Sequence, residues 1–138
     1  TRTKENYPFD IRVHLMKDQS NDWSFVNIYP RVGYHFATIA STGLGGYIGN
    51  INGFIKRHFD SSDILISRIK ELSLIIASNF EEFYSHKISE LGVDLAVDKN
   101  MNIFIIEVNV NKVGIIYYEF DVAKHAIAYA KRLAVQQK

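Results

Sequence analysis

Hydrophobic and polar residues alternate along two segments near the N-terminus. Residues 7–17 place apolar side chains at every second position: Phe9, Ile11, Val13 and Leu15. Because successive side chains of a strand point to opposite faces, this pattern predicts a strand with one buried face. Polar residues 18–22 form a turn cluster, and residues 23–31 are a second strand-like run. Pro30 cannot donate to a ladder, so it belongs at an edge or an end of the resulting hairpin.

A helical period replaces the alternation in the middle of the chain. Ser61 or Ser62 can cap a long helix, and Asp63 suits its positive N-terminus. Its apolar residues recur every three or four positions, which predicts a buried stripe of Leu65, Ile69, Leu72, Ile76, Phe80 and Phe83. A last helix is predicted from about residue 119 to 135, burying Val122, Ala126, Tyr129 or Ala130, and Leu133.

Two further strands are predicted between these helices. Residues 92–98 and 102–110 are rich in Val, Ile and Phe, and residues 98–102 supply the turn. Residues 32–53 show no regular period and hold six of the eight glycines. The order of elements predicts an α+β fold, an antiparallel sheet with helices packed on one face. No repeat or linker interrupts the chain, so residues 1–138 are predicted to be a single domain.

Composition narrows the classes of function. At 138 residues the chain can bury a sizeable core, and its 47% apolar content is ordinary for a globular protein. The net charge is +1 and the basic residues are scattered, so neither a nucleic acid nor a membrane is predicted as a partner. The absence of cysteine excludes disulfides, thiolate metal sites and thiol nucleophiles, and fits a cytoplasmic protein.

The second predicted hairpin carries carboxylates where apolar residues are usual. If Asp98 pairs with Ile103 across a four-residue loop, Asp94 lies directly opposite Glu107, and Asn109 shares the face of Glu107. Like charges facing each other across a sheet are destabilising. A Mg²⁺ ion between them would remove this repulsion, because Mg²⁺ takes oxygen ligands. The alternative is a solvent-exposed sheet face with two unrelated acids.

These residues also carry a resemblance to a known family. The string GVDLAVDKNMNIFIIEVN resembles the end of an ATP-grasp domain, where an acid and a following Glu-x-Asn hold the magnesium ions that bridge nucleotide phosphates. The resemblance assigns these roles to Asp94, Glu107 and Asn109. Within ATP-grasp proteins the chain is similar to the bacterial spore coat-associated YheC/YheD-like group. The further matching segments are PFDIRVHLMKD with WSFVNIYPRVGYHF, GLGG, and DVAKHAIAYAKRLA.

Arg12 and Arg31 are the candidate catalytic residues. Arg12 lies mid-strand on the face opposite Phe9, Ile11 and Val13, within an Asp-x-Arg string similar to that of the family, whose arginine lies near the reacting phosphate. A planar guanidinium matches phosphate oxygens well. Arg31 is the second candidate. The alternative interpretation is an exposed Arg12 paired with Asp10 and a surface Arg31.

Gly45 and Gly46 complete the candidate ligand-binding residues. The GLGG segment has backbone N–H groups that can approach a ligand, and the resemblance implies that it positions the acceptor substrate. The alternative is that these glycines serve only to form a loop. Two departures from the family leave the acceptor open. No asparagine precedes these glycines in Ala40-Ser41-Thr42, and no Pro-Gly turn follows Asn109.

The resemblance implies the C-terminal subdomain of an ATP-grasp fold, without the N-terminal part of its parent protein. That subdomain would be the ATP- and Mg²⁺-binding half of a carboxylate–amine, or similar, ligase that works through an acyl phosphate. Its partners would be a nucleotide and a small carboxylate, with a spore coat association. Catalysis is expected of the longer parent and not of this part alone. Two alternatives remain: a non-catalytic binding or structural module of the spore coat, and a homodimer through the surface left by the missing subdomain.

Overall fold

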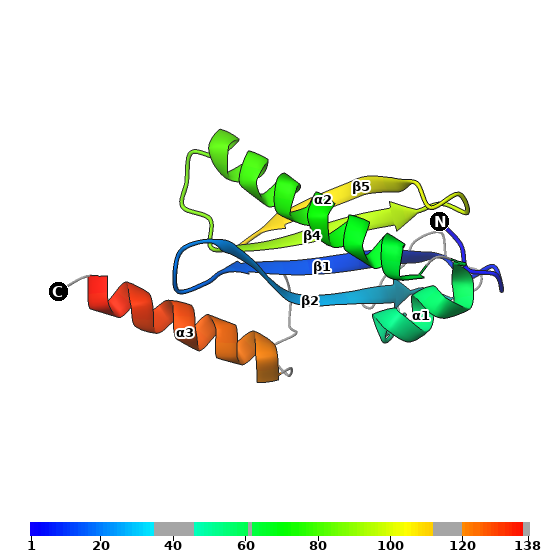
Figure 1. Cartoon of the computed structure of the whole chain (residues 1–138), viewed down its shortest axis with the longest axis horizontal. Coiled ribbons are helices and arrows are strands. Elements are labelled where there is room, and N and C mark those ends of the chain that lie inside the picture. The colour runs from blue at the N-terminus through cyan, green and yellow to red at the C-terminus, as the bar shows by residue number, and fades with distance from the viewer. Residues whose placement is uncertain (35–45, 61, 112–119, 137–138) are drawn as a thin grey trace.

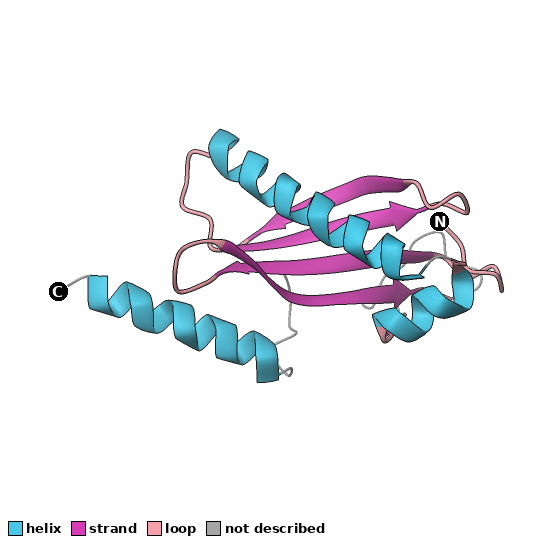
Figure 2. Ribbon diagram, viewed as in Figure 1, coloured by secondary structure: helices cyan, strands magenta, loops and turns pink. Residues whose placement is uncertain are grey.

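The fold is built on a five-stranded antiparallel sheet (Figure 1 and Figure 2). The computed structural model describes residues 1–34, 46–60, 62–111 and 120–136. Its elements are β1 (Phe9–Lys17), β2 (Trp23–Val32), β3 (Tyr47–Ile48), α1 (Ile51–His58), α2 (Ser62–Phe83), β4 (Glu90–Val97), β5 (Ile103–Val110) and α3 (Phe120–Gln136). The strands lie in the order β3-β2-β1-β4-β5. The α+β fold class that the sequence predicts is therefore confirmed.

Two short elements, β3 and α1, fall in or next to the region for which the sequence predicts no regular structure. The prediction is wrong there. Asn50 caps α1, since its side chain accepts a hydrogen bond from the backbone N–H of Gly53 at 3.0 Å. Three residues of α1 enter the core: Ile51, Phe54 and Ile55. A helix of only eight residues among glycines does not repeat its apolar spacing often enough for a period to show.

The core lies between the sheet and helices α1 and α2, and Figure 1 shows α2 running obliquely across the strands. Its central residues come from β1, β4 and α2, namely Ile11, Val13, Leu15, Leu91, Val93, Leu95, Leu65 and Ile69. The last helix, α3, lies along β1 and β2 with Val122 fully buried. Ala126, Tyr129 and Leu133 are half-buried, as the predicted apolar side of this helix requires.

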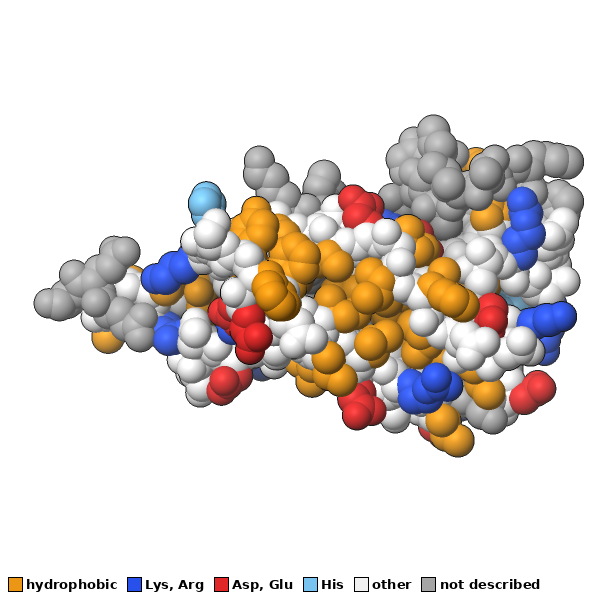
Figure 3. Space-filling model, turned by 90° about the horizontal axis from the view of Figure 1, so that it is seen from above, with side chains coloured by type: hydrophobic (Ala, Val, Ile, Leu, Met, Phe, Trp, Pro, Cys, Tyr) orange, Lys and Arg blue, Asp and Glu red, His pale blue; other side chains and the backbone are white. Residues whose placement is uncertain are grey.

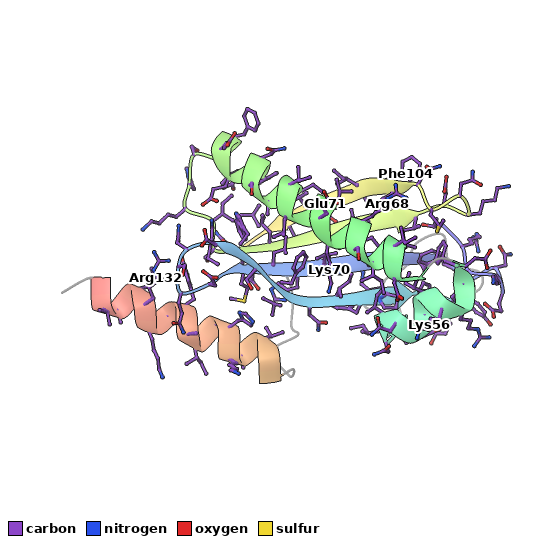
Figure 4. All side chains as sticks on the ribbon, in the orientation of Figure 1. Lys56, Arg68, Lys70, Glu71, Phe104 and Arg132 are labelled. Atoms are coloured by element: carbon purple, nitrogen blue, oxygen red, sulfur yellow. The ribbon has the colours of Figure 1, made fainter. Side chains whose placement is uncertain are left out.

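The buried stripe of α2 is rotated from the predicted one. Leu65, Ile69 and Ala77 are fully buried, and Ile76 and Phe80 pack against them. Because these residues centre on an i, i+4 row, Leu72 and Phe83 fall at the margin of the buried face. Leu72 is therefore only half-buried, and the prediction that Phe83 is core is wrong, because its side chain is 89% exposed. The charged residues Arg68, Lys70 and Glu71 project from the same helix (Figure 4).

Replacing Ile69 with alanine is expected to lower the free energy of unfolding by about 2–5 kcal/mol, because it leaves a cavity in a close-packed core. Ile64→Ala is the matched control on the same helix, since Ile64 is 63% exposed. That control is expected to change the free energy of unfolding by less than about 0.5 kcal/mol. Urea denaturation of both variants measures the difference. Equal shifts would contradict the assignment of Ile69 to the core.

The β4–β5 pairing contains a bulge that determines which residues face each other. Asp94 lies opposite Glu107, as the sequence predicts, but Leu95 lies opposite Ile105. The predicted partner of Ile103 is wrong by one residue, since Ile103 pairs with Val97 and not with Asp98. Between the Asp94–Glu107 pair and the Leu95–Ile105 pair, β5 contains one residue more than β4. This extra residue offsets the one-residue error at the turn, so Asp94 still lies opposite Glu107. A regular ladder from the actual turn would have turned Glu107 to the other face of the sheet.

The Asp98 carboxylate organises the β4–β5 turn. Its Oδ1 accepts hydrogen bonds from the backbone N–H groups of Asn100 and Asn102, at 2.8 and 2.9 Å. Its Oδ2 accepts one from the Asn102 side chain at 2.9 Å. The hydrogen bonds from the side chain and backbone of Asn102 lead the causes that hold the pKa of Asp98 below its ordinary value.

This lowered pKa predicts a pH dependence of stability. The ionised Asp98 favours the folded state, so its contribution is present above the ordinary aspartate pKa of about 3.9 and is lost as the pH falls through the lowered pKa. We expect a carboxyl ¹³C NMR titration to give a midpoint below about 3.9 for Asp98. Melting curves of Asp98→Asn should lose this part of the acid dependence. A midpoint at or above the ordinary value would contradict the prediction.

Candidate functional site

A row of polar side chains follows the face of β1 that points away from the α1–α2 core. Asp10, Arg12 and His14 alternate with the core residues of the strand, so they share this face. All three are largely buried, and the Arg12 side chain is only 12% exposed. The alternative interpretation of Arg12 as an exposed surface residue is therefore wrong. Buried charges need partners, and the neighbouring strands supply them.

Two arginines and two aspartates form one network on this face. Arg12 and Asp94 are directly opposite across β1 and β4, and Asp10 and Arg31 are opposite across β1 and β2. Arg12 donates from Nε to Oδ1 of Asp94 and from Nη2 to Oδ2, the latter at 2.6 Å. Arg31 binds Asp10 in the same two-pronged manner at 2.7 Å, and its Nη2 also lies 2.9 Å from Oδ2 of Asp94. The Asp94 carboxylate therefore contacts both guanidinium groups.

Burial and charge act in opposite directions on this network. Burial raises the pKa of the Asp10 carboxyl above its ordinary value and outweighs the hydrogen bonds and charge of Arg31, which lower it. Burial also acts to lower the pKa of Arg31, but the hydrogen bond and charge of Asp10 and the charge of Asp94 outweigh it and hold that pKa above its ordinary value. Arg31 is therefore a permanent cation on this face, as a phosphate ligand must be.

Glu107 and Asn109 extend the same face onto β5. Glu107 is opposite Asp94, and Asn109 is opposite Gly92. The Glu107 side chain is exposed, whereas Nδ2 of Asn109 is buried and has no hydrogen-bond partner among the described residues. The structure thus brings five predicted residues from four strands to one face, namely Arg12, Arg31, Asp94, Glu107 and Asn109.

Of the two predicted ligand-binding glycines, Gly45 and Gly46, the structure describes only Gly46. Gly46 is half-buried and directly precedes β3, whose Ile48 pairs with Arg31. That pairing puts Gly46 near the end of the sheet where Arg31 and Asp10 lie. Gly45 lies outside the described residues.

Sequence reasoning missed one buried pair on this face. His14 Nε2 lies 2.8 Å from Oε1 of Glu90, and both residues are buried, at 1% and 6% exposure. The signal was present in the Asp-x-Arg-x-His spacing, because residues two apart on a strand share a face.

The donor set fits a hard divalent cation better than a transition metal. Within the described ranges no three His, Cys, Asp or Glu side chains cluster as metal ligands. What the face offers is two carboxylates and a carboxamide oxygen, which suit Mg²⁺ with water and phosphate oxygens completing its shell. The Nδ2 atom of Asn109 is buried and has no hydrogen-bond partner among the described residues, so those residues do not account for the position of this amide. The residues therefore fit Mg²⁺.

A wide cavity among the described residues lies elsewhere. It has a volume of about 720 Å³, is open to solvent, and is lined by the N-terminal segment, β3 and α1, including Tyr7, Tyr47, Asn50, Phe54 and Arg57. None of the five assembled site residues lines it. We locate the candidate site on the polar sheet face, because oppositely charged side chains and polar atoms without a described partner gather there. The size of a cavity does not by itself indicate a binding or catalytic site.

No helix within the described parts of the chain is both long and apolar enough to cross a bilayer.

A family model described as YheC/D-like ATP-grasp matches residues 1–133. The chain is also similar to the endospore coat-associated protein YheC of Bacillus subtilis (strain 168), with 24% identity over 107 residues. That match covers 77% of this chain and 29% of the relative, so the chain spans less than a third of that protein.

Proposed function

Because the chain belongs to the YheC/D-like ATP-grasp family, we propose that it forms the ATP- and Mg²⁺-binding half of a ligase. The substrates would be a small carboxylate and an amine or similar nucleophile. The observation that carries the proposal is the assembly of Asp94, Glu107 and Asn109 beside two arginines on one sheet face. Residues 1–138 would then be the C-terminal subdomain, and the rest of the active site would come from another part of a longer polypeptide.

In the proposed reaction ATP phosphorylates the carboxylate, and the nucleophile then displaces phosphate from the acyl phosphate. Asp94, Glu107 and Asn109 would hold Mg²⁺, which supplies charge neutralisation at the phosphate oxygens. Arg12 and Arg31 would steady the transferring phosphoryl group, because positioned cations stabilise charge that develops in the transition state. This chemistry requires no protein nucleophile.

The charge on the face supports this arrangement. Within the Asp10–Arg12–Arg31–Asp94 network and its neighbour Glu107, leaving the His14–Glu90 pair aside, three carboxylates stand against two guanidinium groups. One negative charge is left over, so the face attracts a cation. A bound dication would reverse the sign of the net charge and suit a polyphosphate.

Gly46 would contribute a backbone N–H beside the acceptor substrate, as would Gly45.

The proposal is tested by calorimetric titration of the protein with ATP in the presence and absence of Mg²⁺. We expect heat of binding only when both are present. A folded protein that binds no nucleotide under either condition would refute the proposed site. A positive result would justify a screen of carboxylates and amines for ADP release.

One observation favours a non-catalytic alternative. The Asp94 carboxylate already contacts two guanidinium groups, so a cation must compete with both for its oxygens. In that case the domain would be a binding or structural module of the spore coat, a location that we propose from the name of the YheC relative. Such a module would fold normally and give no Mg²⁺-dependent heat with ATP.

For the homodimer we propose an apolar surface other than the one that the sequence predicts, which is the surface left by the missing subdomain. Hydrophobic side chains gather on the face seen in Figure 3. Between α2 and β5 lies a groove of about 570 Å³ whose lining includes Ile76, Phe80, Phe83, Ile105 and Val108. We propose this groove as the surface through which two copies would associate if the domain is isolated. Sedimentation at several concentrations tests it, and a concentration-independent monomer would refute it.

A further inference from the structure

The buried His14–Glu90 pair has no role in the proposed reaction and leaves one ring nitrogen unused. An ionised carboxylate only accepts hydrogen bonds, so beside an ionised Glu90 the hydrogen between His14 Nε2 and Glu90 Oε1 belongs to the ring. In this tautomer of the neutral imidazole, Nδ1 is an acceptor. This atom is buried and has no partner among the described residues. An unpaired buried acceptor is costly, so a group that satisfies it stabilises the site.

A second unpaired atom lies on the same row of the sheet. His14 is directly opposite Gly92, and Gly92 is directly opposite Asn109, whose Nδ2 is also buried without a described partner. Residues opposite each other in an antiparallel sheet project to the same face. Adjacent strands lie about 4.8 Å apart, so the Cα atoms of His14 and Asn109 are separated by roughly 10 Å. Gly92 has no side chain, so no side chain of β4 stands between them, and we call the position above Gly92 on this face the notch.

We propose that one water molecule occupies this notch, donates to Nδ1 of His14 and accepts from Nδ2 of Asn109. Buried waters typically join polar groups that have no other partner. The polar characters match, because one side of the notch offers an acceptor and the other a donor.

The water would give His14 and Glu90 a positioning role, and this part rests on the proposed function. A carboxamide ligates a cation through its oxygen alone, so an Asn109 side chain turned by 180° would present its NH₂ group. Holding Nδ2 toward the notch keeps Oδ1 for the cation beside Asp94 and Glu107. Partners of this kind orient the ligands themselves, and their removal typically weakens metal affinity by about 10–100-fold.

The water is tested first, without metal, by NMR of ¹⁵N-labelled protein. We expect cross-peaks between water and the carboxamide protons of Asn109. They should disappear in Gly92→Ala, whose methyl group would take the place of the water. Gly53→Ala is the matched control, because a methyl there would meet only Asn50 Oδ1, at 3.8 Å. No cross-peak in the wild type, or one that survives in Gly92→Ala, would overturn the water.

The positioning role is tested with Mn²⁺ as the probe, measured by water-proton relaxation. His14→Gln keeps an amide that can reach Glu90 but removes the acceptor at Nδ1. We expect both His14→Gln and Gly92→Ala to bind Mn²⁺ about 10–100-fold more weakly, with Gly53→Ala unchanged. Should His14→Gln fail to fold, Gly92→Ala decides, because it leaves the His14–Glu90 pair in place. Wild-type affinity in Gly92→Ala would overturn the role. A wild type that binds no Mn²⁺ would overturn both the positioning role and the proposed function. The NMR result would still decide whether the water molecule is present.

Discussion

Glu107→Gln is expected to abolish Mg²⁺-dependent nucleotide binding and to leave the fold intact. Glutamine has nearly the shape of glutamate but lacks the charge that a hard cation requires. The fold should survive because the Glu107 side chain is exposed and stands opposite another carboxylate, Asp94. Removing one of two facing like charges relieves repulsion between the strands.

Calorimetry with ATP and Mg²⁺ measures the loss, and a thermal melt of the same sample verifies the fold. Glu82→Gln is the matched control, because Glu82 is an exposed glutamate on α2, an element that contributes none of the assembled site residues. We expect that control to bind as the wild type does. Normal binding by Glu107→Gln would remove Glu107 from the site and favour the non-catalytic module.

Asp94→Ala is expected to have the largest effect on stability among the charged residues, about 3–5 kcal/mol. The Asp94 side chain is only 2% exposed and accepts the hydrogen bonds of Arg12 while contacting Arg31. Truncation leaves the Arg12 guanidinium buried without its main partner and deprives Arg31 of its second carboxylate. The cost comes chiefly from stranding buried positive charge and only in small part from the lost contacts.

The exposed pair of Arg57 and Glu5 provides the comparison. It has the same chemistry, with a guanidinium donating to a carboxylate at 2.7 Å, but its side chains are 69% and 40% exposed. Exposed pairs contribute little because water screens them. We expect Glu5→Ala to leave the denaturation midpoint almost unchanged while Asp94→Ala lowers it strongly. Similar midpoints for the two variants would show that water reaches the Asp94 network.

Most of the architecture follows from local pattern. Period-two alternation predicted β1, period 3.6 predicted α2 and α3, and polar clusters predicted both hairpin turns. The misses have physical causes. The helix α1 is too short for a period to show, and the orientation of α2 depends on which side of the helix meets the sheet. A spacing rule cannot distinguish the centre of a buried stripe from its margin, which is why Phe83 was assigned to the core.

The facing of Asp94 and Glu107 was predicted correctly through a register that is wrong at the turn. The sequence contains no local signal for the β5 bulge, because bulges respond to the packing of the whole sheet. The same limit applies to the ion pairs. Spacing along β1 suggested Asp10 as the partner of Arg12, yet each arginine has as its main partner the aspartate directly opposite it on a neighbouring strand.

The sequence by itself determined the fold class, most of the elements and the residue types of the candidate site, because periodicity and side-chain chemistry are local properties. Only the tertiary structure decided that β1 has β2 and β4 as its two neighbours, which joins Asp10, Arg12, Arg31 and Asp94 in one buried network. It also decided that His14, Gly92 and Asn109 share a row. The residues of that row lie up to 95 positions apart in the chain, and strand order brings them together through long-range pairing that no short window of sequence records.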